Sequence, residues 1–531
     1  MKKIIALCLL AVLLCFAPGC TSNQQEQQQG PKQVTDYQNT NETPRKGGTL
    51  RLAMAGATSF NPLLAENNNN LYVLKLLHDS LFQRTAKDVL EPVLCESYSV
   101  SEDGLTYEFT VKNNVSFHNG AKLTAKDVEA TLSAIFASEN SLYRSRLSAI
   151  SAFQSEGMKL TVTLAYPVVN FPTLLDFPVL SEHDLASGID TLTLTPNGCG
   201  RYKVQSYKKS KELYLTVNEN YHRGFSPNIE NITVYLLKDA ETAVAMLENM
   251  QIDVLTSDVI DLYAYTPKRN LSSKEFSGGG FTFIGINNQK PAFLSSKTRS
   301  ALNEAIHKEK IVSDNALTYG VAAEIPIPTG SFWNNSQSLP AIKETQQVKT
   351  ILSEDGWTDA DGNGVPEKDV YGEYTELKPE ILVNEENQLR VKIAEQIKNA
   401  WNAIGVPAYV TTVPFAEYQS RIESGVYDVF VGGVSILPNY DLSFMLKTDS
   451  NVCGISHEKI DQTLQALAFT DQDLQKQNLF HELCDAIRSE VPVISLYFEN
   501  NVLVFDSRLR GAIEPSGSDA YYGIENWFLA E

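Results

Sequence analysis

The sequence lacks the residue patterns that mark most catalytic sites. Its seven histidines include no HExxH arrangement, and no GxSxG sequence places a serine on a sharp turn. Ser206 and Lys209 match an SxxK pattern, but they lie between two strand-like segments, whereas a nucleophile of this type begins a helix. We therefore expect no catalytic residue and no enzymatic activity. An envelope hydrolase with a dispersed triad is the alternative from the enzyme class.

Cysteine is also scarce, with seven residues and no CxxC or CxxH pair. A zinc site and a thioredoxin-type redox motif are therefore not indicated, and we expect no metal and no cofactor. Four of the cysteines belong to the main body of the chain, and they allow three different disulfide pairings that the sequence does not distinguish. These four are Cys95, Cys199, Cys453 and Cys484.

Positively charged residues are few, since the chain has 44 lysines and arginines but 64 acidic residues, which gives a net charge of −20. Such a surface disfavours nucleic acid and anionic lipid as direct partners. Apolar residues make up 43%, which is ordinary for a soluble protein, and the length suits about three domains of roughly 150 residues each.

The long apolar run Ile4–Phe16 follows Lys2 and Lys3 and is too short for a comfortable membrane span. It ends at Ala17-Pro18-Gly19-Cys20, the outline of a lipoprotein signal peptide. We predict a signal peptide over 1–19 and lipid attachment at Cys20, with ordinary cleavage near the same place as the alternative. Residues 20–46 are rich in Gln, Asn, Thr and Ser and are predicted to form a disordered tether with a reach of about 25 Å.

The remaining chain alternates strand and helix signals. The first strand is expected at 47–54, a hairpin at 105–120, and a helix whose start is capped by Thr124 and Asp127. A central strand is expected at 280–287, followed by a helix over 297–312. Farther on, a helix ends at Gly405, the strand 408–413 and a helix from Phe415 follow, and a further strand covers 427–433. This last series indicates a β-α-β unit in a lobe of its own.

Residues 359–364, Asp-Ala-Asp-Gly-Asn-Gly, carry carboxylates at alternate positions and could supply oxygen ligands for calcium. An EF-hand requires a bidentate glutamate at the position of Val370, which is missing. A polar hairpin turn is the favoured interpretation.

Several separated motifs resemble the solute-binding proteins of family 5, the oligopeptide-, dipeptide- and nickel-binding proteins of ABC transporters. The longest match includes the segments 101–109 (SEDGLTYEF), 115–120 (VSFHNG) and 123–128 (LTAKDV). The segment 198–202 (GCGRY) stands in the place of the family's glycine-rich turn, and 298–302 (TRSAL) adds a further match. The resemblance extends over nearly all of 47–531.

The resemblance implies an α/β, bilobal fold of the periplasmic-binding-protein type II, in its large three-domain form, with the ligand cleft between the lobes. Lobe I is expected from 47–90, 188–288 and 490–531. An accessory domain is expected at 91–187 and lobe II at 289–489. The segments near 288 and 490 would then act as hinges for closure around the ligand.

The resemblance also implies a ligand site. The candidate ligand-binding residues lie at the end of the last predicted strand and in the segment after it, together with aromatic residues of the central strand and of the region near the second hinge. They are Gly432, Gly433, Ser435, Leu437, Asn439, Tyr440, Asp441, Phe281, Phe283 and Tyr497. Each aromatic residue is as well suited to the core as to the wall of a pocket.

One position departs from the family pattern, because Leu437 stands where an aspartate normally binds the α-amine of a peptide, and Val434 stands where a tryptophan is common. A buried ammonium without a carboxylate is costly. Three options follow. Asp441 takes over the amine, the alignment is shifted, or the ligand has no free amine at this point. Asp441 as a simple turn carboxylate is an equally good interpretation.

The function implied by the resemblance is that of a monomeric, lipid-anchored substrate-binding protein of an ABC importer. It would capture peptides outside the cytoplasmic membrane, or in a periplasm, and deliver them to a membrane permease. A sensing lipoprotein of the same fold is one alternative. A binder of a non-peptide solute or a nickel chelate is another.

Overall fold

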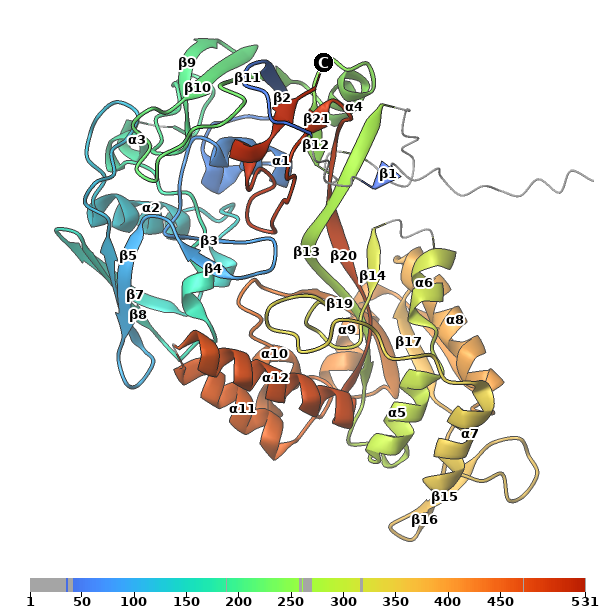
Figure 1. Cartoon of the computed structure of the whole chain (residues 1–531). Helices are drawn as coiled ribbons and strands as arrows, with labels where there is room; N and C mark the ends of the chain where they lie inside the picture. The colour runs from blue at the N-terminus through green and yellow to red at the C-terminus, as the bar shows by residue number, and fades with distance from the viewer. Residues whose placement is uncertain are drawn as a thin grey trace, which may run out of the picture.

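The computed structural model describes residues 42–187, 189–256, 260, 270–315, 319–470 and 472–530, together with the backbone of β1 (Thr35–Asp36). The described chain forms two halves of mixed sheets and helices joined by two long strands (Figure 1). This arrangement confirms the predicted bilobal α/β class. The predicted signal peptide, Cys20 and most of the predicted tether lie outside the described residues.

The upper half in Figure 1 is built on a four-stranded sheet. Its strands, in spatial order, are β2 (Thr49–Ala55), β11 (Asn231–Leu237), β10 (Glu212–Val217) and β9 (Tyr202–Lys208). Side chains alternate along β2, so that Leu50 and Ala53 enter different cores. Helix α1 (Asn68–Lys75) shares the core of Leu50, and α4 (Ala240–Glu248) shares the core of Ala53. The two helices therefore cover opposite faces of the sheet.

The last residues of the chain complete this half. Short strands β21 (Leu509–Arg510) and β22 (Phe528–Leu529) pair with each other, and Trp527 is buried in the core that also contains Leu50. The beginning and the end of the folded chain therefore lie in one hydrophobic core.

A separate antiparallel sheet lies at the left of Figure 1. In spatial order it contains β5 (Cys95–Val100), β6 (Thr106–Val111), β8 (Lys159–Leu164) and β7 (Ile150–Glu156), and it is accompanied by α2 (Ala125–Ala137) and α3 (Glu182–Ser187). The predicted cap is confirmed, since Thr124 and Asp127 form a capping box at the start of α2.

The prediction of a hairpin at 105–120 is wrong. Strand β6 pairs with β5 and β8, and the chain after it forms only a bridge between Ser116 and Lys122.

Strands β13 (Leu271–Ile286) and β20 (Val493–Asp506) run between the halves and pair antiparallel along most of their length. Their upper residues belong to the cores of the upper half, and their lower residues to those of the lower half. The register of the pairing shifts between Phe276 and Gly280. There Gly279 has a φ of +87°, and a methyl group on Gly278 would lie 2.3 Å from the carbonyl oxygen of Glu499. This glycine bulge bends the strand pair where the two halves meet.

The lower half continues the sheet of β13 through β19 (Val429–Ser435), β17 (Glu380–Asn384) and β18 (Tyr409–Val413), and β17 is parallel to both β18 and β19. Helices α8 (Gln388–Ala403) and α9 (Phe415–Glu423) connect these strands, which confirms the predicted β-α-β series. The single helix predicted over 297–312 is instead two helices, α5 (Ser296–Glu304) and α6 (Lys308–Asp314). The chain turns between them because Ile306 enters the core.

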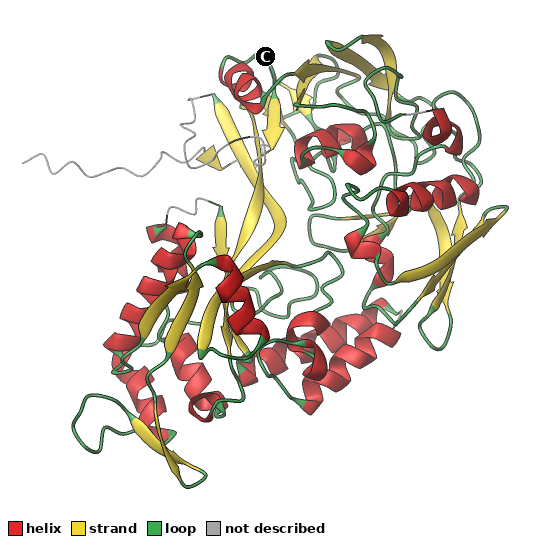
Figure 2. Ribbon diagram, turned by 180° about the vertical axis from the view of Figure 1, so that it is seen from behind, coloured by secondary structure: helices red, strands yellow, loops and turns green. Residues whose placement is uncertain are grey.

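The other elements of the lower half lie around this sheet (Figure 2). They are α7 (Thr345–Glu354), β15 (Glu367–Val370), β16 (Glu373–Glu376), α10 (Ser443–Leu446), α11 (Glu458–Phe469) and α12 (Asp473–Glu490). One further strand, β14 (Gly320–Ala322), belongs to the sheet itself and pairs antiparallel with β20. The acidic segment 359–364 lies in a loop that an antiparallel bridge closes between Thr358 and Glu367. Carboxylate oxygens of Asp359, Asp361 and Glu367 lie within 4.8 Å of one another in this loop. The loop belongs to the end of the lower half that is remote from the upper half (Figure 1).

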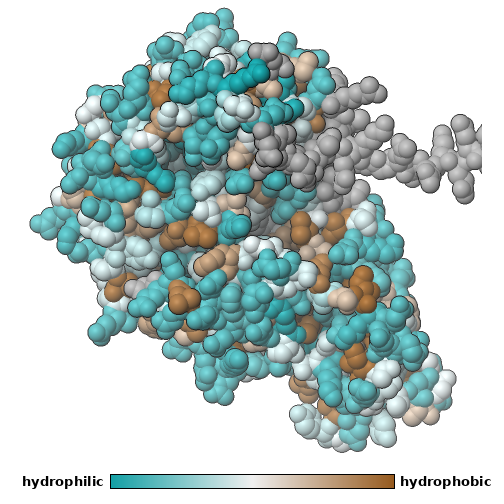
Figure 3. Space-filling view, viewed as in Figure 1, coloured by the Kyte–Doolittle hydropathy of each residue, from teal (hydrophilic) through white to brown (hydrophobic). Residues whose placement is uncertain are grey.

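Cys95, Cys199, Cys453 and Cys484 are all buried and free, so the structure contains none of the three possible disulfide pairings. Within the described ranges, no helix has the length and apolar character that crossing a bilayer requires. The face seen in Figure 3 is mostly hydrophilic, and its hydrophobic residues form small separate patches.

Candidate functional site

The candidate site begins at one edge of the lower sheet. Strands β17, β18 and β19 are parallel, and their carboxyl ends are Asn384, Val413 and Ser435. Helix α8 starts at the same edge, where the side chain of Asn387 accepts a hydrogen bond from the backbone N–H of Arg390 at 3.0 Å. In open α/β sheets, ligands bind outside the carboxyl ends of parallel strands. This edge also lies beside the glycine bulge, because the backbone N–H of Ile436 donates to Gly279 O at 2.8 Å.

Gly432 and Gly433, near the end of β19, leave room for neighbouring side chains. A methyl group on Gly433 would lie 1.9 Å from Nη2 of Arg390, so the guanidinium lies directly against the glycine backbone. Within the described part of the chain, this guanidinium has no ion-pair or hydrogen-bond partner. Arg390 is partly exposed. The edge of the sheet therefore carries a cation with which no carboxylate of the described chain forms an ion pair.

The aromatic candidates lie next to these glycines but face the core. Phe281 and Phe283 on β13 pair with Val434 and Gly432 of β19, and their rings stack at a centroid distance of 5.6 Å. Both side chains are buried. Tyr497 on β20 is also buried, and it pairs with Thr282 of β13 and with Ala322 of β14. The structure thus brings Gly432, Gly433, Ser435 and the two phenylalanines together on neighbouring strands.

The segment after β19 turns back on itself. Leu437 is 37% exposed, and its carbonyl accepts a hydrogen bond from the backbone N–H of Tyr440 at 3.0 Å. Asp441 accepts a hydrogen bond from the backbone N–H of Ser443 at 3.0 Å, so its carboxylate is engaged at the start of α10. Leu437 therefore offers an exposed apolar side chain where the resemblance implied an aspartate, while Asp441 already has a local hydrogen-bonding role.

Asn439 and Tyr440 are buried against the rest of the molecule rather than exposed at the edge. The Tyr440 hydroxyl donates to Oδ2 of Asp88 at 2.8 Å, and Oδ1 of Asp88 accepts from Nη1 of Arg84 at 2.8 Å. The side-chain amide of Asn439 donates to Val169 O at 2.9 Å. Burial, and next the charge of Asp88, raise the pKa of Tyr440 well above its usual value, so the hydroxyl remains a donor.

We name Arg84, Asp88 and Tyr440 the buried triad. It links the loop after β19 to the turn between β3 (Phe82–Arg84) and β4 (Leu90–Pro92). Sequence reasoning missed Arg84 and Asp88. Their spacing of four residues was a weak signal, because such spacing is common on the surface of helices.

The model of the family described as "Bacterial extracellular solute-binding proteins, family 5 Middle" matches residues 89–452. The chain belongs to this family. The family 5 resemblance of the sequence motifs is thereby confirmed. Oligopeptide-binding protein AppA of Bacillus subtilis is 25% identical over 99% of this chain and 99% of its own length. Heme-binding protein A of Haemophilus influenzae is 24% identical over 83% of this chain and 85% of its own length.

Solved structures agree with this fold. The structure of HbpA2 from Haemophilus parasuis has a TM-score of 0.72 with 22% identity, covering 91% of this chain and 100% of its own. The periplasmic murein tripeptide binding protein MppA in an unliganded open form has a TM-score of 0.74 with 15% identity, covering 92% of this chain and 98% of its own. The relatives of this family 5 protein are thus solute-binding proteins, and their names indicate different solutes.

Proposed function

We propose that this family 5 protein is the substrate-binding component of an ABC importer, with no catalysis of its own. It would be anchored through Cys20 at the outer face of the bacterial cytoplasmic membrane, or in a periplasm, and act as a monomer. It would capture a peptide between its two halves and deliver it to the permease. The division into lobe I, accessory domain and lobe II at the boundaries predicted above belongs to this proposal.

The observation that supports this proposal most directly is the unneutralised guanidinium of Arg390 against Gly433, at the carboxyl ends of three parallel strands. An extended peptide can pair its backbone with a strand, and its terminal carboxylate can pair with an arginine. The glycine bulge in β13 gives the two halves a place to bend, and a ligand that binds both halves favours closure. AppA, which matches 99% of this chain over 99% of its own length, is named for oligopeptide binding.

Leu437 favours a second candidate, a solute without a free amine. An exposed leucine provides no counter-charge for an ammonium, and the Asp441 carboxylate is already hydrogen-bonded at α10. Relatives named for heme and for nickel show that the family includes proteins named for solutes other than peptides.

Native mass spectrometry of the purified full chain, followed by denaturation and sequencing of the released molecules, tests the proposed cargo. A series of short peptides is expected. A single non-peptide adduct or a metal complex would replace the peptide proposal with the second candidate.

Asp441→Asn then tests whether Asp441 binds the amine of the ligand, since asparagine keeps the oxygen that accepts from Ser443 but loses the charge. Unchanged affinity for a free peptide would assign Asp441 to the turn.

We expect Arg390→Gln to weaken binding of the captured peptide about tenfold or more, because a charge-assisted hydrogen bond is lost. The measurement is titration calorimetry with the free peptide and with its C-terminally amidated form. The amide should bind the wild type about as weakly as the free peptide binds the variant, and the variant should no longer distinguish the two. Lys392→Gln, an exposed cation on the same helix, is the matched control and should bind normally. Equal affinities in wild type and Arg390→Gln would remove Arg390 from the site.

A further inference from the structure

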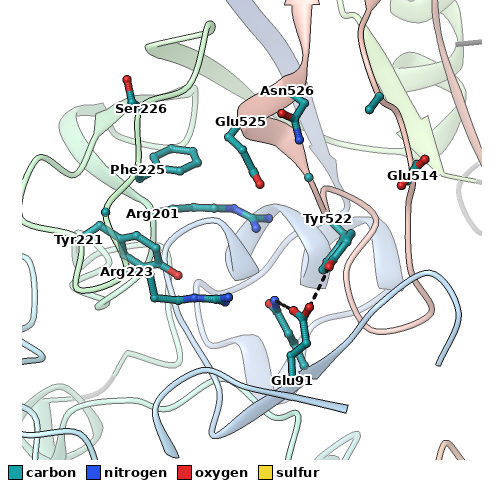
Figure 4. Close-up of a pocket in the computed structure, with 14 residues that line it drawn as sticks. Glu91, Arg201, Tyr221, Arg223, Phe225, Ser226, Glu514, Tyr522, Glu525 and Asn526 are labelled. Carbon is teal, nitrogen blue, oxygen red and sulfur yellow. Dashed lines mark hydrogen bonds between the residues drawn. The ribbon is translucent and has the colours of Figure 1, made fainter. Parts of the chain in front are cut away.

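A cavity of about 600 Å³ lies in the upper half, apart from the candidate site at the edge of the lower sheet. Its walls come from four separate parts of the chain, namely strands β3 and β4, Arg201 just before β9, the residues after β10, and the segment between β21 and β22 (Figure 4). None of its lining residues comes from 289–489, the part of the chain that contains Arg390 and the end of β19. The volume is in the range of small-molecule sites, which is about 300–1,000 Å³. We call it the upper cavity.

Two arginines point into the upper cavity from one side (Figure 4). Arg201 is held in place, because its Nη2 donates to Asp519 at 2.6 Å and to the carbonyl oxygen of Tyr521 at 3.1 Å. Its Nε is buried and has no hydrogen-bond partner among the described residues. Arg223 is exposed, and within the described part of the chain it forms no ion pair. The wall thus presents one rigid cation and one free cation.

Carboxylates line the same cavity without neutralising Arg223. Glu91 accepts hydrogen bonds from Gln83 at 2.8 Å and from the hydroxyl of Tyr522 at 3.2 Å, and Figure 4 shows the second of these beneath the ring of Tyr522. Burial, with the charge of Glu91, raises the pKa of Tyr522 to about 12, so its hydroxyl stays a donor to Glu91. Glu514 and Glu525 also line the cavity, and none of the three glutamates forms an ion pair among the described residues.

Aromatic side chains complete the wall next to the arginines. The rings of Tyr221 and Phe225 meet edge to face at a centroid distance of 6.0 Å, and the Tyr221 hydroxyl is oriented by Asp79 at 3.3 Å. Both residues line the cavity. Aromatic rings that are held in this way offer an edge and a face for another ring to pack against.

We propose that the upper cavity binds a small zwitterion, of the class of an aromatic α-amino acid, as a site beyond the peptide site proposed above. Its carboxylate pairs with Arg201 and Arg223, its ammonium pairs with Glu91 and Glu525, and its ring packs on Tyr221 and Phe225. Arg201 is already balanced by Asp519, but Arg223 and the glutamates of the cavity carry charges of opposite sign that have no ion-pair partner among the described residues. Charges of both signs are complementary to a ligand that carries both, whereas an ion with one charge would leave the other set unpaired.

Equilibrium dialysis of the full chain with labelled L-phenylalanine tests this site. We expect one equivalent of L-phenylalanine to bind. N-acetyl-L-phenylalanine and phenethylamine each lack one of the two charges, so their affinities should be lower by about tenfold or more. Arg223→Gln and Glu91→Gln should each weaken L-phenylalanine binding by a similar factor. Arg144→Gln, which removes an exposed arginine elsewhere, is the matched control and should bind normally.

Arg390→Gln separates this site from the proposed peptide site. Binding of L-phenylalanine that persists in Arg390→Gln and falls in Arg223→Gln supports the upper cavity whether or not the chain carries peptides. Binding that falls in Arg390→Gln alone would place the amino acid at the sheet edge and overturn the inference. No binding at millimolar L-phenylalanine, or equal binding of phenethylamine, would also overturn it.

Discussion

Replacing Asp88 by asparagine is expected to lower the free energy of unfolding by about 3 kcal/mol or more. Asp88 and Arg84 are buried, with side chains 6% and 7% exposed, and their charges balance each other at 2.8 Å. Asparagine is nearly the same size but uncharged, so the arginine would remain buried without this counter-ion. The Tyr440 hydroxyl would also lose a charged acceptor. Urea denaturation followed by circular dichroism measures the change.

An exposed ion pair provides the comparison. Lys159 and Glu108 lie 2.6 Å apart with side chains 58% and 45% exposed, so Glu108→Gln should cost less than about 1 kcal/mol. Tyr440→Phe should cost about 1–3 kcal/mol by removing one buried hydrogen bond. Tyr418→Phe is its matched control. It also removes one buried tyrosine hydrogen bond, but this bond goes to an uncharged acceptor, Val431 O, within the lower half. If Asp88→Asn is no more destabilising than Glu108→Gln, the buried triad does not stabilise the fold through its charges.

Replacing Gly198 by alanine is expected to destabilise the upper half by about 3 kcal/mol or more. The added methyl group would lie 1.7 Å from the carbonyl oxygen of Leu77, which is backbone and cannot rotate away. The same carbonyl accepts a hydrogen bond from the backbone N–H of Gly200 at 2.8 Å. The glycine-rich turn is therefore a close approach between two backbones, and the methyl group would force them apart.

The matching control is Gly157→Ala. Gly157 has a φ of +62° but nothing within 4 Å of the position of an added methyl group, so only backbone strain of about 1–2 kcal/mol is expected there. Thermal unfolding of the two variants separates the effects. A loss for Gly198→Ala that is no larger than that for Gly157→Ala would mean that the two backbones can move apart at little cost.

The sequence was most informative where the structure depends on neighbouring residues. The capping box at Thr124 and the helix that ends before Gly405 were predicted, since a cap and a C-terminal glycine act within one turn. The hairpin at 105–120 was predicted wrongly, because the partners of β6 are β5 and the distant β8 rather than the residues that follow it. Local alternation indicates a strand but does not select its partner.

The candidate site shows the same division. The glycines at the end of β19 were identified from their motif, but the contact of Arg390 with Gly433 depends on how α8 starts beside that strand. The buried triad joins Asp88 to Tyr440 across most of the chain, and no pattern in the sequence relates these two residues. The position of Leu437 was the one local clue that the ligand contacts of this chain differ from the usual ones.

Strand β20 and the residues after it are synthesised after the rest of the described chain, yet β20 pairs with β12 (Val254–Thr256) and β13, and Trp527 enters the core of Leu50. The core of the upper half therefore cannot be completed until the residues up to Trp527 have been synthesised, however early its first strand emerges. A truncation that removes β20 and the residues after it would leave this core incomplete.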